Sequence, residues 1–253
     1  MALRSGSIDP ATFTVVRLFS GAIILFVLVG VKHSILSCGV GGSWKSGIAL
    51  FVYAAGFSWA YINLTVATGA LILFGCVQGT MIVSAYYKGE RFGVRQALGC
   101  VLAIVGLVIL LLPGLAAPAP VSAMFMTMAG VSWGVYSLLG KSFSNPLVAT
   151  AGSFLRALPF ALVMGLMFLS QVKASSYGVM LAFVSGAFTS GLGYAVWYKV
   201  LSHIKSSTAA VVQLCVPVLA ALGGVVLLGE VLTVRMVVSA VLTLLGIGMV
   251  VLR

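Results

Sequence analysis

Two arginines, Arg17 and Arg156, lie well inside long apolar runs of the sequence. A charge at the depth of a bilayer costs about 2.5–3.5 kcal/mol on insertion scales, so such a residue usually faces a cavity or a partner. A guanidinium binds carboxylate or phosphate groups through two parallel hydrogen bonds. We therefore expect an anionic or zwitterionic small-molecule partner, with Arg156 as its main electrostatic contact. The alternative is that both side chains reach the lipid headgroups, from within about two turns of a helix end.

Aromatic residues concentrate on three predicted helices, which begin near residues 46, 120 and 177. Rings and hydroxyls in a stripe can line a pathway for a small molecule, whereas aromatic residues near helix ends form the belts of membrane interfaces. Tyr61 and Tyr198 fit either position. The deeper residues are predicted to face a cavity, and they are Tyr53, Trp133, Tyr136 and Tyr194.

Pro217 stands in the middle of a predicted helix over residues 207–228, and we interpret it as structural. Proline cannot donate to the carbonyl four residues earlier, which here belongs to Gln213. A free carbonyl and the Gln213 amide would form a polar spot in an apolar helix. Gln213 is therefore a candidate binding residue, and Gln78 is a weaker counterpart in the first half.

The chain has three acidic residues, Asp9, Glu90 and Glu230. Each glutamate follows a glycine, Gly89 or Gly229, and opens a predicted helix. There a carboxylate meets the partial positive charge of the helix N-terminus, and glycine permits a tight turn. We interpret both Gly-Glu pairs as structural. With no carboxylate predicted at mid-membrane, a proton relay has no obvious carrier.

An enzyme within the membrane would need a nucleophile with a base, or a set of metal ligands. The histidines, His33 and His203, fall in predicted loops, and neither HExxH nor GxSxG occurs. The four cysteines form no CxxC pair and are interpreted as packing residues. We therefore expect no enzyme activity, no metal and no cofactor. The basic residues occur singly between apolar runs, which is typical of loop charges and not of a nucleic-acid-binding surface.

The composition predicts a membrane protein, because 62% of the 253 residues are hydrophobic and only 7% are charged. A soluble domain carries about 25% charged residues. Since one span takes about 20 apolar residues, we predict an all-α integral membrane protein in contact with the lipid bilayer, with about nine transmembrane helices. Their predicted ranges are 11–31, 46–65, 68–87, 93–113, 120–140, 147–170, 177–200, 207–228 and 232–252.

The loop charges predict the orientation of these helices. With the C-terminus in the cytoplasm, nine loop lysines and arginines lie inside, and only Arg4, Lys173 and Arg235 lie outside. Cytoplasmic loops carry the excess of basic residues. The sequence therefore predicts a cytoplasmic C-terminus and, with nine spans, an external Met1.

An internal repeat appears when the sequence is shifted by 140 residues. GERFGVRQALGCVLAIVG (89–106) then aligns with GEVLTVRMVVSAVLTLLG (229–246), and a glycine, a glutamate and an arginine are among the identical positions. Five predicted spans separate the copies, and an odd number inverts their orientation. Inverted repeats are the architecture of many secondary transporters. We predict one repeat over 1–114, with four helices, and one over 115–253, with five.

These segments, together with DPATFTVVRLFSGAIIL near the N-terminus, resemble the EamA-type transporters of the drug/metabolite transporter superfamily. The resemblance covers nearly the whole chain and implies two inverted five-helix repeats, of which the first here lacks one helix. It implies a secondary carrier in the bacterial inner membrane that exports a small polar or amphipathic metabolite by alternating access. A homodimer is left open.

The missing helix leaves a second hypothesis open, in which the chain is a truncated, non-transporting remnant or an assembly subunit. If instead the gene start was assigned too late, we expect the reading frame upstream of the Met1 codon to encode about 20 further apolar residues.

Overall fold

The computed structural model describes residues 3, 6–32, 41–90, 93–112, 119–228 and 231–251. Within these ranges every regular element is a helix, apart from an isolated bridge between Ile8 and Ala174. The predicted all-α fold is therefore confirmed. The elements are α1 (Pro10–Lys32), α3 (Trp44–Ala60), α4 (Val66–Tyr87), α5 (Val94–Leu111), α6 (Pro120–Gly140), α7 (Pro146–Met167), a 3₁₀ turn (Leu169–Gln171), α8 (Ser176–Val184), a π-helical segment (Ser185–Leu192), α9 (Gly193–Leu201), α10 (Ser206–Val212), α11 (Cys215–Leu228) and α12 (Val234–Val251).

Seven helices in this part of the chain are long and apolar enough to cross a membrane, namely α1, α4, α5, α6, α7, α12 and the continuous run Ser176–Leu201. The protein is thus a multi-pass integral membrane protein. Two predicted spans differ from a simple membrane helix. Helix α3 has 17 residues, and the helix predicted over 207–228 is interrupted at Gln213 and Leu214. The number of nine spans therefore stays a prediction.

The interruption between α10 and α11 has its cause in Pro217, which has no N–H to offer the Gln213 carbonyl. That carbonyl accepts instead from the N–H of Val216 at 3.1 Å, and the N–H of Leu214 donates to Val211 at 3.0 Å. Hydrogen bonds over three residues tighten the turn. The Gln213 carbonyl is therefore occupied, and the sequence prediction of a free carbonyl was wrong.

Side-chain caps begin several helices. At the start of α3, the Ser43 hydroxyl accepts from the Ser46 N–H at 3.1 Å, and the Ser46 hydroxyl accepts from the Ser43 N–H at 2.9 Å. Before α7, the Asn145 side chain accepts from the Val148 N–H at 3.2 Å, and Pro146 takes the first helical position. These caps bond N–H groups that have no partner within their own helix.

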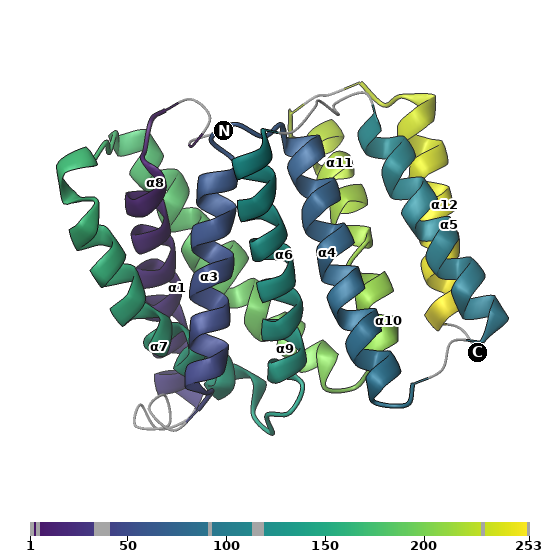
Figure 1. Cartoon of the computed structure of the whole chain (residues 1–253), viewed down its shortest axis with the longest axis horizontal. Coiled ribbons are helices and arrows are strands. Elements are labelled where there is room, and N and C mark those ends of the chain that lie inside the picture. The colour runs from purple at the N-terminus through teal and green to yellow at the C-terminus, as the bar shows by residue number, and fades with distance from the viewer. Residues whose placement is uncertain are drawn as a thin grey trace. The chain divides into compact units, whose positions relative to one another are not determined.

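The helices group into two compact units. The first unit comprises Met1–Leu64 and Ala119–His203, and the second comprises Thr65–Pro118 and Ile204–Arg253. In the first unit, α1 packs on α7 and on the π-helical segment, and α3 lies beside α6 (Figure 1). In the second unit, α5 packs along α12, and α4 lies beside α10 (Figure 1). Each unit therefore combines helices from both predicted sequence repeats.

Many large apolar side chains are exposed, as lipid-facing helices require. Tyr87 is 84% exposed and Leu166 is 69% exposed. Soluble proteins rarely expose contiguous apolar patches, so in this chain the informative side chains are the polar ones that face inward. In the first unit the buried polar residues include Thr14, Arg17, Ser20, Ser46, Ser58, Ser122, Ser137, Thr150, Ser153 and Ser190.

Candidate substrate site

The guanidinium of Arg17 is the centre of a buried polar cluster in the first unit. Its Nε donates to the Ser190 hydroxyl at 2.8 Å, and its Nη2 donates to the hydroxyls of Tyr194 at 2.8 Å and Tyr53 at 3.3 Å. Arg17 is only 5% exposed. The side chain therefore does not reach the lipid headgroups, and helices α1, α3 and α9 meet with the π-helical segment around it.

Aromatic rings enclose this arginine. The Arg17 Cζ atom lies 5.4 Å from the ring centre of Tyr53 and 5.1 Å from that of Phe57, within the range of cation–π attraction. The Trp133 ring of α6 lies 4.9 Å from the Tyr53 ring and 4.5 Å from the Tyr194 ring. We call Arg17, Tyr53, Trp133, Ser190 and Tyr194 the Arg17 cluster.

Close packing of α1 on the π-helical segment places Arg17. A Cβ atom at Gly186 would overlap the Arg17 carbonyl oxygen and the Ser20 hydroxyl, so only glycine lets the two backbones approach this far. A π-helical turn contains an extra residue and re-aims the side chains that follow, and such turns are frequent at functional sites. Ser190 reaches the Arg17 Nε from within this segment.

Sequence reasoning did not single out Ser190. Helical periodicity assumes 3.6 residues per turn, and a local π-helical stretch breaks that register. The signal nearest to it is the run of small residues from Ser185 to Gly193, which the sequence shows but which does not reveal the direction of one hydroxyl.

The surroundings of Arg17 are uncharged among the described residues. Its Nη1 atom is buried and has no hydrogen-bond partner there. Asp9 is engaged elsewhere, since its two carboxylate oxygens accept from the N–H groups of Thr12 and Lys173, each at 2.9 Å. Partial burial opposes the charge of Asp9, yet the hydrogen bonds from Thr12 and Lys173 hold the pKa of its carboxyl below its usual range.

Arg156, the predicted main electrostatic residue, has a different environment. It is half-buried on α7, and its Nη1 donates to the backbone carbonyl of Gly41 and to that of Gly152 at 3.0 Å. These bonds tie the segment before α3 to the middle of α7. The structure therefore places Arg17, and not Arg156, at the centre of the aromatic cluster.

Tyr136 and Tyr198 extend the ring packing behind Trp133. The Trp133 and Tyr136 rings lie 5.6 Å apart, and the Tyr136 and Tyr198 rings lie 4.9 Å apart. The Tyr198 hydroxyl donates to the Tyr136 carbonyl at 2.7 Å, and both residues are fully buried. Tyr198 is thus a core residue and does not belong to an interfacial belt.

Gln213 and Gln78 belong to the second unit. The Gln213 amide donates to the sulfur of Met81 at 3.1 Å, and the Gln78 amide donates to the Ala210 carbonyl at 3.3 Å. Both side chains are buried. They join α4 to α10 and the turn after it, so their hydrogen bonds lie within the second unit and do not involve the Arg17 cluster.

Glu90 stabilises a helix other than the one predicted. Its carboxylate accepts from the N–H of Ser206 at 3.3 Å and from the N–H and hydroxyl of Ser207 at 3.1 and 2.7 Å, at the N-terminus of α10. Helix α5 begins instead at Val94, and the N–H of Gly93, the residue before it, donates to the Gln96 side chain at 3.1 Å. The structural interpretation of Glu90 fits these contacts, but the helix that it caps lies far along the chain.

The glycine before Glu90 has the conformation that its turn requires. Gly89 has a φ of +79°, in the region that favours glycine. The corresponding pair in the predicted second repeat, Gly229 and Glu230, lies outside the described residues.

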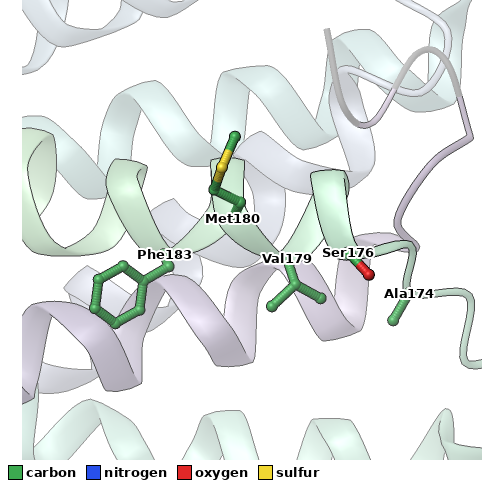
Figure 2. A pocket seen from close by; sticks show the side chains of 5 residues that line it. All are labelled: Ala174, Ser176, Val179, Met180 and Phe183. Atoms are coloured by element: carbon green, nitrogen blue, oxygen red, sulfur yellow. The ribbon is translucent and has the colours of Figure 1, made fainter.

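A shallow groove of about 570 Å³ lies along α8 in the first unit (Figure 2). The residues that line it are Ala174, Ser176, Val179, Met180 and Phe183. Figure 2 shows one oxygen-bearing side chain among them, that of Ser176. The groove shares no residue with the Arg17 cluster, and its apolar walls suit contact with lipid chains.

Comparison with known proteins connects this arrangement to transport proteins. The sequence model of the EamA-like transporter family matches residues 121–252. An uncharacterised protein of Pseudomonas aeruginosa is 47% identical over 98% of this chain and 86% of its own length. An uncharacterised transporter of Archaeoglobus fulgidus is 29% identical over 81% of this chain and 74% of its own length. The uncharacterised transporter YoaV of Bacillus subtilis is 22% identical over 98% of this chain and 90% of its own length.

The fold also matches a solved crystal structure, with a TM-score of 0.80 and 21% sequence identity. The match covers 98% of this chain and 91% of that one. At this identity the likeness shows a shared helical architecture alone.

Proposed function

Because the chain belongs to the EamA-like transporter family and is a membrane transporter of the drug/metabolite type, we propose that it binds its substrate at the Arg17 cluster and moves it by alternating access. Family membership points to a transporter and not to an enzyme, and it implies contact with the lipid bilayer and with a small-molecule substrate. The proposed substrate is a small polar or amphipathic metabolite, and the proposed direction is export.

The observation that carries this proposal is the origin of the groups around Arg17. Arg17 and Tyr53 come from the predicted first repeat (1–114), whereas Trp133, Ser190 and Tyr194 come from the predicted second repeat (115–253). In transporters with inverted repeats, the substrate site lies where the repeats meet, and rocking of one against the other opens it to alternate sides. A cluster built from both repeats changes its contacts when they move.

Tyr194 provides the first test. We expect Tyr194→Phe to lower transport at least about tenfold, because it removes the closer of the two hydroxyls that accept from the Arg17 Nη2 atom and leaves only that of Tyr53, at 3.3 Å. The measurement is uptake into proteoliposomes across a panel of amino acids, organic acids and sugars. Tyr87→Phe is the matched control, since that ring is 84% exposed. Equal transport by wild type and Tyr194→Phe would rule out a substrate site at the cluster.

The second test concerns orientation in the proposed bacterial inner membrane, with the C-terminus in the cytoplasm. Lys141 and Lys173 lie on either side of α7. In a background with all four cysteines replaced by alanine, we expect Lys173→Cys to react with an impermeant maleimide added to intact cells. Lys141→Cys is expected to react only after the membrane is opened. The reverse pattern would place the C-terminus outside, against the charge asymmetry of the loops.

The oligomeric state follows from none of these contacts, and the homodimer stays a prediction. The mass of the purified protein in detergent, measured by light scattering with the detergent contribution subtracted, distinguishes one copy from two.

A further inference from the structure

We propose that Arg17 is the anion-binding group of this transporter and that the substrate carries a carboxylate, which binds the Nη1 edge of the guanidinium. This inference rests on the proposed function and names the chemical class of its substrate. It also moves the anion-binding role from Arg156, which the sequence favoured, to the other arginine within a predicted span.

The hydrogen bonds of Arg17 leave one edge of the guanidinium available. Nε bonds Ser190 and Nη2 bonds Tyr194 and Tyr53, so these atoms are fixed within the protein. Nη1 is buried and has no partner among the described residues. Native structures rarely leave a buried charged donor without an acceptor, and each such case calls for an explanation. A ligand oxygen that occupies this position in the transport cycle supplies one.

The positive charge of Arg17 also favours a carboxylate ligand. Its described partners are hydroxyls and aromatic rings, which carry no net negative charge. The carboxylates of Asp9 and Glu90 are bonded to other groups, near Lys173 and at the start of α10. A positive charge in a span is normally paired or turned toward a cavity. A substrate carboxylate would bring both the opposite charge and acceptor oxygens.

The contacts of Arg156 do not create the same need. Its Nη1 donates to two backbone carbonyls, those of Gly41 and Gly152. The residue is also half-buried and not enclosed as Arg17 is. Its bonds hold two segments of the first unit together, which is a structural task that requires no ligand.

The test uses purified full-length protein and matched pairs of probes in which a carboxylate is replaced by the neutral primary amide of similar size. These are acetate and acetamide, benzoate and benzamide, and N-acetylglycine and its amide. The readout is the shift in the thermal unfolding midpoint as the probe concentration rises, since a ligand that binds the folded state raises the midpoint. We expect the carboxylates to raise it and the amides to leave it unchanged.

Substitutions assign the effect to one arginine. Arg17→Lys keeps the charge but lacks the planar fork, so we expect the apparent affinity for the carboxylates to fall at least about tenfold. Arg235→Lys, at an exposed position, is the matched control. If Arg17→Lys does not fold, Ser190→Ala replaces it. That change removes the partner that holds the Arg17 Nε without removing the charge, and the carboxylate affinity is again expected to fall.

Several results would contradict either the carboxylate proposal or the proposed function. The inference is wrong if no carboxylate shifts the wild-type midpoint, if amides bind as well as carboxylates, or if Arg156→Lys abolishes binding while Arg17→Lys does not. Transport of an uncharged or cationic compound that Tyr194→Phe impairs would retain the proposed function and overturn the substrate class. Carboxylate binding that requires Arg17, without transport of any tested compound, would retain the anion site and count against the proposed function.

Discussion

Replacing Gly186 by alanine is expected to destabilise the protein by about 1–3 kcal/mol, the usual cost of overpacking a filled interior, and to abolish transport. The added Cβ atom would overlap the backbone carbonyl of Arg17 and the hydroxyl of Ser20. Because one of these atoms belongs to the backbone, a side-chain rotation cannot relieve the overlap. Helix α1 must then move away from the π-helical segment, and Arg17 must move with it.

Gly193→Ala is the matched control for this substitution. A Cβ atom at Gly193 would meet the Phe188 carbonyl oxygen at 3.7 Å, which is an ordinary van der Waals contact. Both glycines lie in the same continuous helical run, so a general effect of alanine on that helix would appear in both variants. The measurements are thermal unfolding in detergent and uptake into proteoliposomes. Equal behaviour of the two variants would show that close packing at Gly186 does not position Arg17.

Replacing Glu90 by alanine is expected to produce the second large effect, a loss of about 1.5–3 kcal/mol in the stability of the second unit. The substitution removes a charged acceptor that bonds the N–H of Ser206 and the N–H and hydroxyl of Ser207. These N–H groups belong to the first turn of α10 and have no acceptor within the helix. The favourable contact between the carboxylate and the helix dipole is also lost.

The control for Glu90 is Gln96→Ala, which removes an uncharged and exposed cap of α5. We expect Gln96→Ala to cost no more than about 0.5–1 kcal/mol. Hydrogen exchange followed by mass spectrometry of α10 peptides distinguishes the two variants, since only Glu90→Ala should speed exchange there. Unchanged exchange at α10 in Glu90→Ala would mean that this cap contributes little to the stability of the second unit.

The positions of most helices could be predicted because the bilayer sets them. The apolar run predicted over 11–31 corresponds to α1 (Pro10–Lys32), and the run over 120–140 corresponds to α6 (Pro120–Gly140). Length and hydropathy are properties of a single segment, so they can be read without knowledge of its neighbours. The break at Gln213 could not be predicted in detail. Pro217 predicts an irregular helix there, but it does not indicate which carbonyls the neighbouring N–H groups then bond.

The candidate site could be predicted in its residue types but not in its pairing. The sequence indicates Tyr53, Trp133 and Tyr194 through their depth and chemistry, and the structure brings them together around Arg17. Their role in substrate binding stays a prediction. Nothing in the sequence distinguishes Arg17 from Arg156, since the difference depends on which distant groups each guanidinium meets.

The roles of Arg156 and Glu90 could not be predicted because their partners lie far away in the sequence. The long-range acceptor for Arg156 is the backbone carbonyl of Gly41, and a backbone carbonyl carries no sequence signal. The partners of Glu90, at the start of α10, are separated from it by more than a hundred residues. A carboxylate that opens a predicted helix is normally assigned to that helix, so only the fold could identify the helix that it caps.

The interleaved composition of the two units has a consequence for the growing chain at the ribosome. Helices α4 and α5 are long and apolar enough to enter the bilayer as soon as they are made, but their unit is completed only after Ile204. Synthesis of Ala119–His203 takes on the order of 10 s at 5–20 residues per second. During this interval the amide of Gln78 lacks its acceptor on α10. Helices α4 and α5 are therefore open to mispairing and to membrane proteases until the rest of their unit is made.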